Sequence, residues 1–299
     1  MANLRDIRRR IKSVKNTAQI TRAMQMVAAA KMKKAQDQAM AGRDYADLLN
    51  QVLVNLKSNI DDEAHPMLES RDEGGKELIL VISTDKGLCG ALNTNLGKKV
   101  RADAPDADVV TVGRKLRIQL GKTGRKMLAD FEVGDPVSFS DARAVAKFIT
   151  QEFLDQKYAK VSVAFNQFVS TIKQEPTIVQ LLSVPTEKLG EKRSYEGMGD
   201  KMEVAETDYA AAMDKDYLFE PSTAEVLNAL LPRYINFQVY QMLLESRASE
   251  HSARMVAMKA ATDNANEFIK DLTLEYNKLR QAAITSELLE ITTAMRAME

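Results

Sequence analysis

The sequence is short of the side chains from which most catalytic and metal sites are built. Among 299 residues there are one cysteine, two histidines and no tryptophan, and aromatic residues make up 6%. The single cysteine, Cys89, excludes an internal disulfide, and with His65 and His251 it leaves little material for a thiolate or imidazole metal site. We therefore expect a reducing compartment, no metal and no cofactor.

Long apolar runs are also missing. No segment approaches the roughly 20 apolar residues that a membrane-spanning helix needs, and the start lacks the apolar core of a signal peptide. The Arg-rich start is similar to a mitochondrial presequence, but its apolar spacing continues unbroken into the next fifty residues, which favours a mature helix. We expect no direct membrane insertion.

The formal net charge is +0, yet charge of one sign gathers at the N-terminus. Between residues 1 and 34 only Asp6 is acidic, against ten basic residues: Arg5, Arg8, Arg9, Arg10, Lys12, Lys15, Arg22, Lys31, Lys33 and Lys34. A basic helix fits nucleic acid, anionic lipid or an acidic protein surface, and these residues alone leave those alternatives open beside a plain solvated face.

Helix breakers are absent from both ends. Every proline lies between Pro66 and Pro232, and every glycine except Gly42 lies between Gly74 and Gly199. Apolar and small residues recur at alternating steps of three and four from Leu4 to Ile60 and again from Leu227 to Ala283. From Ile284 the second pattern shifts phase and continues as Leu288, Ile291, Met295 and Met298, which indicates that the tip meets a different surface.

The C-terminal pattern predicts a helix from about residue 222 to 298, on the order of 110 Å long at about 1.5 Å per residue. A helix of this length gains little from propensity alone and needs a partner, and the N-terminal segment has the matching pattern. We predict an antiparallel coiled coil of residues 1–60 and 222–299, with His251 as a packed residue that helps to fix its register.

The middle of the chain alternates between strand and helix patterns. Strands are predicted at Glu77–Thr84, Asp108–Val112, Lys160–Phe165 and Thr177–Val184, and helices at 90–102 and 141–156. This order predicts a small Rossmann-like α/β domain over residues 76–186 with a partly parallel sheet. Residues 187–221 are polar and Gly-spotted and are predicted to form an irregular connection.

Two segments invite a search for enzymatic chemistry. Gly121, Lys122 and Thr123 imitate part of a phosphate-binding loop, but the glycine required at position 116 is Leu116, so the spacing fails. The segment from Ser83 to Gly90 leaves a predicted strand, where α/β sheets often bind ligands, but its two glycines form no dinucleotide fingerprint. A structural or partner-facing turn is favoured there over an anion site.

The Met and Ala residues from Ala23 to Met32 are apolar nearly all the way around a helix. Two interpretations are open at this point. Either the local core is thicker, or small and flexible side chains slide against several partners as a bearing.

Four runs resemble the gamma subunit of F-type ATP synthases. They are Arg10–Ala29, Ser83–Asn95, Ser249–Asn264 and Tyr276–Glu287, and they occur in the order of that family. One departure lies at Ala294–Met295, where the family usually has Gly-Ala. The segment 103–216 matches only loosely.

This resemblance implies a central-stalk rotor rather than an enzyme. The coiled coil would occupy the centre of a ring of alternating alpha and beta subunits, and the α/β domain would sit with epsilon on the c-ring of the membrane sector. Ion flow would turn the c-ring, and the shaft would drive the catalytic beta subunits through their nucleotide states. The implied location is peripheral, on the cytoplasmic face of the bacterial inner membrane.

The resemblance also implies contact residues. Arg280, Gln281, Thr285 and Glu287 would contact the beta-subunit catch region, with Met24 packing opposite them on the N-terminal helix. Lys31, Lys33 and Lys34 are candidates for the acidic lever loops of beta, and Asp85, Lys86 and Cys89 lie on a turn expected near the same ring. Tyr217 and Glu220 would rest on the c-subunit loops.

Two other function classes remain alternatives. An α/β nucleotide-binding enzyme with coiled-coil arms would bind or turn over nucleotide as an isolated chain. A basic coiled coil for nucleic acid would bind mixed-sequence DNA in a salt-dependent manner, but the basic run has no stacking aromatics, so we expect no nucleic-acid partner.

Overall fold

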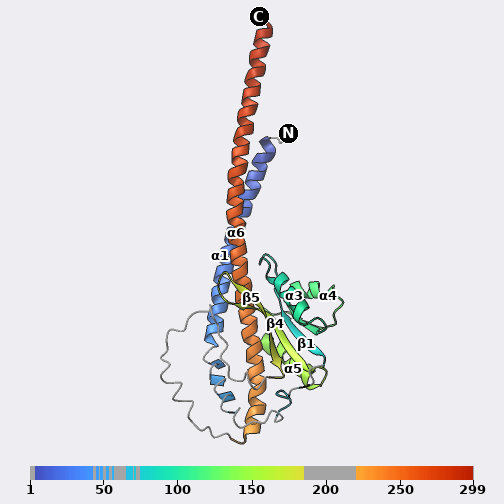
Figure 1. Ribbon diagram of the computed structural model, residues 1–299. Coiled ribbons are helices and arrows are strands. Elements are labelled where there is room, and N and C mark those ends of the chain that lie inside the picture. Colours follow the sequence, from blue (N-terminus) through green and yellow to red (C-terminus); the bar gives the residue numbers. More distant parts are fainter. Residues whose placement is uncertain are drawn as a thin grey trace. The chain divides into compact units, whose positions relative to one another are not determined.

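The computed structural model describes residues 4–42, 45, 46, 48, 49, 52, 53, 56, 65–69, 71, 75–184 and 220–298, and its elements are labelled in Figure 1. Packing divides the chain into two units, Met1–Ala28 with Met255–Glu299 and Ala29–Arg254. The divisions predicted at residues 60 and 222 follow the sequence periodicity and stay a prediction.

Two long helices form where the apolar spacing alternates between three and four. They are α1 (Leu4–Ala41) and α6 (Thr223–Met298), and α6 continues through Pro232. The described residues 45, 46, 48, 49, 52, 53 and 56 are also helical. The predicted long helices at both ends are therefore confirmed, while Ile60 lies outside the described residues.

In the first unit, α1 and α6 pack side by side as an antiparallel pair (Figure 1). Their buried residues fall on the predicted spacing: Ile7, Ala18, Thr21 and Ala28 on α1, and Met258, Thr262 and Leu272 on α6. The Oγ1 atoms of Thr21 and Thr262 lie 2.7 Å apart in a buried hydrogen bond. This contact fixes the register of the pair and confirms the coiled coil within this unit.

The second unit contains a five-stranded sheet in the order β3-β2-β1-β4-β5. Its strands are β1 (Glu77–Ile82), β2 (Asp108–Val112), β3 (Met127–Phe131), β4 (Lys160–Phe168) and β5 (Gln174–Leu182). Four strands run parallel and β5 runs antiparallel to β4. The helices that follow β1, β2 and β3 are α3 (Leu92–Asp103), α4 (Arg114–Gly121) and α5 (Phe139–Leu154).

Each face of the sheet is covered, because successive side chains of a strand point to opposite faces. Ile79 and Val81 of β1 pack in one apolar cluster with Leu96 of α3 and Leu116 of α4. Leu78, Leu80 and Ile82 pack in another cluster with Val145, Ile149 and Phe153 of α5 and with α6 residues from Leu227 to Ala248. Strands buried on both faces read as continuous apolar runs, as the sequence of β1 does.

The predicted Rossmann-like domain is confirmed, with two elements that the sequence pattern did not indicate. Neither α4 nor β3 was predicted. The helix α4 is only eight residues long, and β3 is a five-residue edge strand. Both are too short to establish a period, since helix and strand patterns need several repeats to stand out. The connection predicted over 187–221 lies outside the described residues except for its last two, Glu220 and Pro221.

Candidate functional site

The four residues expected at the catch region lie on α6 in the first unit. Arg280, Gln281, Thr285 and Glu287 are all exposed, and the Thr285 hydroxyl donates to the Gln281 carbonyl of its own helix at 3.0 Å. Their side chains are therefore available to another chain.

Met24 does not pack opposite these residues, so that part of the prediction is wrong. Thr21 is level with Thr262, and the two helices run in opposite directions. From the level of this pair, Arg280 lies toward one end of the helix pair and Met24 lies toward the other end. Arg280 and Met24 are therefore about 30 Å apart along the axis, at about 1.5 Å per residue. Met24 is partly buried on α1, and beside it Met26 and Val27 are exposed.

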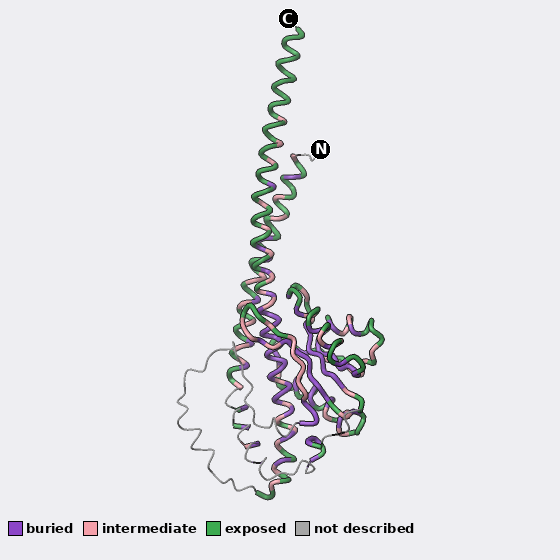
Figure 2. Tube along the Cα trace, viewed as in Figure 1, coloured by how far each residue is buried: buried purple, intermediate pink, exposed green. Residues whose placement is uncertain are grey.

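The end of α6 has large apolar side chains that no described residue of its unit covers. Ile284, Leu288, Leu289, Ile291, Met295 and Met298 are each at least half exposed, and Figure 2 shows this end of the helix as exposed throughout. The register explains the change at Ala283, because α1 begins at Leu4 and Leu4 is level with about Leu279. Exposed apolar residues in a contiguous row mark an interaction surface.

The three lysines of α1 fall in the second unit and differ in their surroundings. Lys31 donates to an Asp135 carboxylate oxygen at 2.6 Å, in the loop between β3 and α5. Lys33 and Lys34 are exposed. Lys31 thus has an ion-pair partner within the chain, which its sequence position did not indicate.

The turn after β1 is closed by hydrogen bonds from Ser83. Its hydroxyl donates to the carbonyls of Val112 and Gly113 and accepts from the Leu116 amide at 3.2 Å. Gly113 has φ +90°, and a Cβ there would lie 2.3 Å from the Ser83 carbonyl oxygen. The ends of β1 and β2 therefore approach each other at a point that only glycine allows.

The rest of the turn is held by Thr84 and Asn93. Asn93 accepts from the Thr84 amide at 3.2 Å and donates to the Thr84 hydroxyl at 2.8 Å and to the Cys89 sulfur at 3.4 Å. Cys89 is buried, and burial raises the pKa of its thiol. Lys86 and Leu88 are exposed. The turn is built by internal hydrogen bonds and presents two side chains to solvent.

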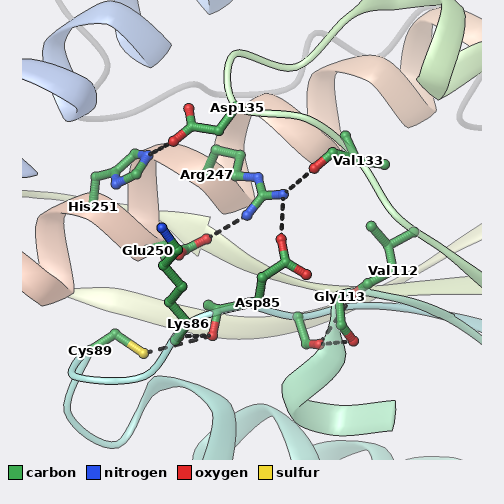
Figure 3. Close-up of polar contacts among 12 residues, drawn as sticks. Asp85, Lys86, Cys89, Val112, Gly113, Val133, Asp135, Arg247, Glu250 and His251 are labelled. Carbon is green, nitrogen blue, oxygen red and sulfur yellow. Dashed lines mark hydrogen bonds and ion pairs between the residues drawn. The ribbon is translucent and has the colours of Figure 1, made fainter.

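Asp85 of this turn meets α6 through Arg247 (Figure 3). Arg247 donates to Asp85 at 3.1 Å, to the Val133 carbonyl at 2.8 Å and to Glu250 at 2.8 Å. Burial by itself would lower the pKa of Arg247, but the two carboxylates more than offset this and raise it. The guanidinium is thus a charged group in a buried position, held by three hydrogen bonds.

About two turns further along α6, Arg254 makes a second connection to the same segment. It donates to Glu250 at 2.7 Å and to the Gly87 carbonyl at 3.3 Å. It also donates to Nδ1 of His251 at 3.3 Å, which therefore accepts and leaves the proton on Nε2. His251 is buried, as predicted, with Nε2 3.4 Å from Asp135. Burial lowers the pKa of His251, although Glu250 and Asp135 act in the opposite direction.

On another side of α6, polar side chains meet the hairpin of β4 and β5. Glu245 accepts from the Phe168 amide at 3.2 Å. Ser249 donates to the Asn166 carbonyl at 2.9 Å, and Ser252 donates to the Thr171 carbonyl at 2.6 Å. These residues and Arg247, Glu250 and Arg254 were not singled out from the sequence. Ser249, Glu250, Ser252 and Arg254 fall within the run Ser249–Asn264 that carries the family resemblance, but that resemblance assigned none of them a role.

The segment that imitates a phosphate-binding loop has the wrong position in the fold. Such a loop precedes a helix and directs its amides at the phosphates from the N-terminal end. Here Gly121 is the last residue of α4 and Lys122 caps its C-terminus. In the part of the chain that the structure describes, no three His, Cys, Asp or Glu side chains are placed to hold a metal, and no helix combines the length and hydropathy of a membrane span.

Comparison with known proteins places this arrangement in a family. The family model described as ATP synthase matches residues 3–298. The ATP synthase gamma chain of Akkermansia muciniphila is 50% identical over 300 residues, and that of Opitutus terrae is 48% identical over 297 residues. These alignments cover 100% and 99% of both chains respectively. The chain belongs to the ATP synthase gamma chain family.

Solved structures carry the same fold. A chain of the central stalk and c-ring of the Tetrahymena thermophila mitochondrial ATP synthase is 25% identical, with a TM-score of 0.59, and the match covers 81% of this chain and 99% of that one. A chain from the Euglena gracilis mitochondrial ATP synthase has a TM-score of 0.65 at 21% identity, over 99% of this chain and 94% of that one. The second likeness concerns the fold alone.

Proposed function

We propose that the chain is the rotating shaft of a rotary ATP synthase and carries out no bond-making chemistry itself. The observation that carries this proposal is the end of α6, where apolar side chains from Ile284 to Met298 project from a helix without a partner in its own unit. A ring of other subunits around this end would cover it. Family membership gives the ring its identity as alternating alpha and beta subunits, with catalysis on beta.

The remaining partners follow from the same family. Epsilon and the c-ring of the membrane sector would bind the opposite end of the shaft, where Glu220 is exposed just before α6; Tyr217 lies outside the described residues. The matched Tetrahymena thermophila chain comes from a central stalk and c-ring, which supports these partners. The chain would be peripheral, on the cytoplasmic face of the bacterial plasma membrane.

The proposed beta contacts are of two kinds. Arg280, Gln281, Thr285 and Glu287 would meet the catch region, and the exposed lysines Lys33 and Lys34 would face acidic lever loops, because opposite charges at an interface steer and orient the partner. Lys31, Met24 and the turn residues Asp85, Lys86 and Cys89 remain proposed near the same ring. Residues 1–60 and 222–299 would form the shaft, 76–186 the α/β domain and 187–221 the connection to the c-ring.

The decisive test is assembly. The purified chain is mixed with separately purified alpha and beta subunits from the same source, and ATP hydrolysis is measured on the size-selected product. We expect a complex with one copy of this chain and hydrolysis well above that of any component alone. A chain that stays free and hydrolyses ATP unaided would overturn the proposal and favour a nucleotide-binding enzyme.

The apolar end of α6 is tested by Leu288→Asp together with Ile291→Asp. Both side chains are 58% exposed, so the fold of the chain should tolerate the change, whereas insertion of two carboxylates into a subunit ring should reduce assembly and hydrolysis. Ile118→Asp is the matched control, because Ile118 is also about half exposed but lies on α4. Equal activity of the double variant and the control would remove the tip from the interface.

A further inference from the structure

The polar contacts of α6 in the second unit lie on two opposite sides of the helix. Glu245, Ser249 and Ser252 are spaced by four and three residues and so share one face, which meets the β4–β5 hairpin. A helix turns about 100° per residue, and these three side chains fall within about 60° of one another.

The second face holds the charged residues. Arg247, Glu250 and Arg254 are spaced by three and four and again share one side. Their partners are Asp85 and Gly87 of the turn after β1 and the Val133 carbonyl. The centres of the two faces lie about half a turn of the helix apart.

All six residues are buried, with at most 9% of any one exposed. A helix that is bound on one side can roll on its neighbour while it exchanges one set of apolar contacts for another. A helix hydrogen-bonded on two opposite sides cannot, because any rotation about its own axis moves both sets of polar atoms away from their partners at once. Buried polar groups without partners are costly, so the contacts on both sides resist the rotation.

We propose that these six residues set the rotational angle of α6 within the α/β domain and are positioning residues for torque transmission. The inference rests on the proposed rotor function, in which force enters at the α/β domain and must leave through α6. Glu245, Ser249 and Ser252 form the hairpin face of this contact, and Arg247, Glu250 and Arg254 form the turn face. Apolar packing holds α6 in place, and the two polar faces prevent it from slipping about its axis.

The test measures angular stiffness in the assembled complex. A bead is attached to the α/β domain through Lys122→Cys on the exposed end of α4, where the buried Cys89 does not compete for the label. The complex is stalled with a non-hydrolysable nucleotide, and the angular variance of the bead is recorded. Variants are Ser249→Ala with Ser252→Ala, Arg247→Met with Arg254→Met, and all four together, with the exposed Arg233→Met on α6 as control.

Suppose that the two faces have similar stiffness and act in parallel. Loss of either face then raises the angular variance that arises at this contact about twofold. Loss of both faces raises this variance by much more than the sum of the two single effects. The control should match the wild type. The ratio of ions pumped to ATP hydrolysed by the complete enzyme should fall in the same order. A residue that merely stabilises the fold would lower the yield of complex without changing the variance of the complexes that form.

The outcomes separate the two proposals. A wild-type chain that forms no active complex refutes the rotor function before any variant is compared. A wild-type complex that rotates, together with a fourfold variant of unchanged variance, overturns the positioning role and leaves the rotor function intact. If Arg247→Met with Arg254→Met prevents assembly, the variant Ser249→Ala with Ser252→Ala decides alone, because the loss of two hydroxyls leaves the turn face and the apolar core in place. Unchanged angular variance in that serine variant also overturns the inference.

Discussion

Replacement of Gly113 by alanine should be much more destabilising than the same change at another glycine with positive φ. Gly113 has φ +90° and ψ 143°, and a non-glycine residue in such a region costs about 1–3 kcal/mol. Its new Cβ would also lie 2.3 Å from the Ser83 carbonyl oxygen, where contacts under 3.0 Å force a shift. The backbone at Ser83 would have to move by at least 3.0 − 2.3 = 0.7 Å.

That shift disturbs hydrogen bonds that join β1 to β2. The Ser83 amide donates to the Val112 carbonyl at 2.7 Å, and the Ser83 hydroxyl donates to the Gly113 carbonyl at 2.9 Å. Two such bonds are worth about 1–3 kcal/mol together. With the strain, and less the roughly 0.4–1 kcal/mol gained by restricting the unfolded chain, Gly113→Ala should cost about 1–5.5 kcal/mol.

Gly124→Ala is the matched control, because Gly124 has φ +71° but nothing within 4 Å of the Cβ position. The backbone strain of Gly124→Ala is about 1–2 kcal/mol, and the restriction of the unfolded chain by alanine largely offsets it. The free energy of unfolding should therefore change by about 1 kcal/mol or less. Urea unfolding of the full-length chain measures both, and hydrogen exchange of the β1 and β2 amides shows where Gly113→Ala acts. Equal stability of the two variants would refute the close-approach argument.

Three further predictions concern the first unit and the buried histidine. Leu272→Ala should lower the free energy of unfolding by about 2–5 kcal/mol, because Leu272 is only 4% exposed. Leu274 is 58% exposed, so Leu274→Ala should change the free energy of unfolding by under about 0.5 kcal/mol. Thermal unfolding of the two variants tests this difference. Thr21→Val and Thr262→Val should show a coupling of about 0.5–1.5 kcal/mol in a double-mutant cycle, and strict additivity would contradict the hydrogen bond. The folded pKa of His251 lies below its ordinary 6.5, so the unfolded chain binds more protons than the folded chain. The free energy of unfolding should therefore fall as the pH drops through 6.5, and it should fall less steeply in His251→Asn. Parallel profiles of unfolding free energy against pH would argue against this.

The coiled coil could be predicted almost residue by residue from the sequence. Each step of three or four keeps an apolar residue on the same side of a helix, so the pattern specifies both the helix and its buried face. Thr21 and Thr262 both belong to the predicted pattern, and the structure pairs them. The pattern also changed phase at Ile284, and Ala283 is the last residue of α6 that is even partly buried.

The polar contacts that α6 makes with the α/β domain could not be predicted, because their partners are distant in the sequence. Arg247 lies 162 residues from Asp85, and Lys31 lies 104 residues from Asp135. A charged residue in a helical sequence pattern ordinarily indicates a side of the helix that faces solvent. A buried arginine such as Arg247 needs a carboxylate partner, and only the fold brings that partner close. The position of His251 on the pattern predicted its burial but not Asp135 as its neighbour.

The separation of the two pairing helices along the chain determines when they can meet during synthesis. Thr21 and Thr262 are 241 residues apart, and at about 5–20 residues per second a ribosome needs roughly 12–50 s to travel between them. All five strands of the sheet are synthesised before α6 begins at Thr223, so α1 has no helical partner while these strands emerge. Its excess of basic residues, which repel one another, helps to keep the waiting segment from aggregating.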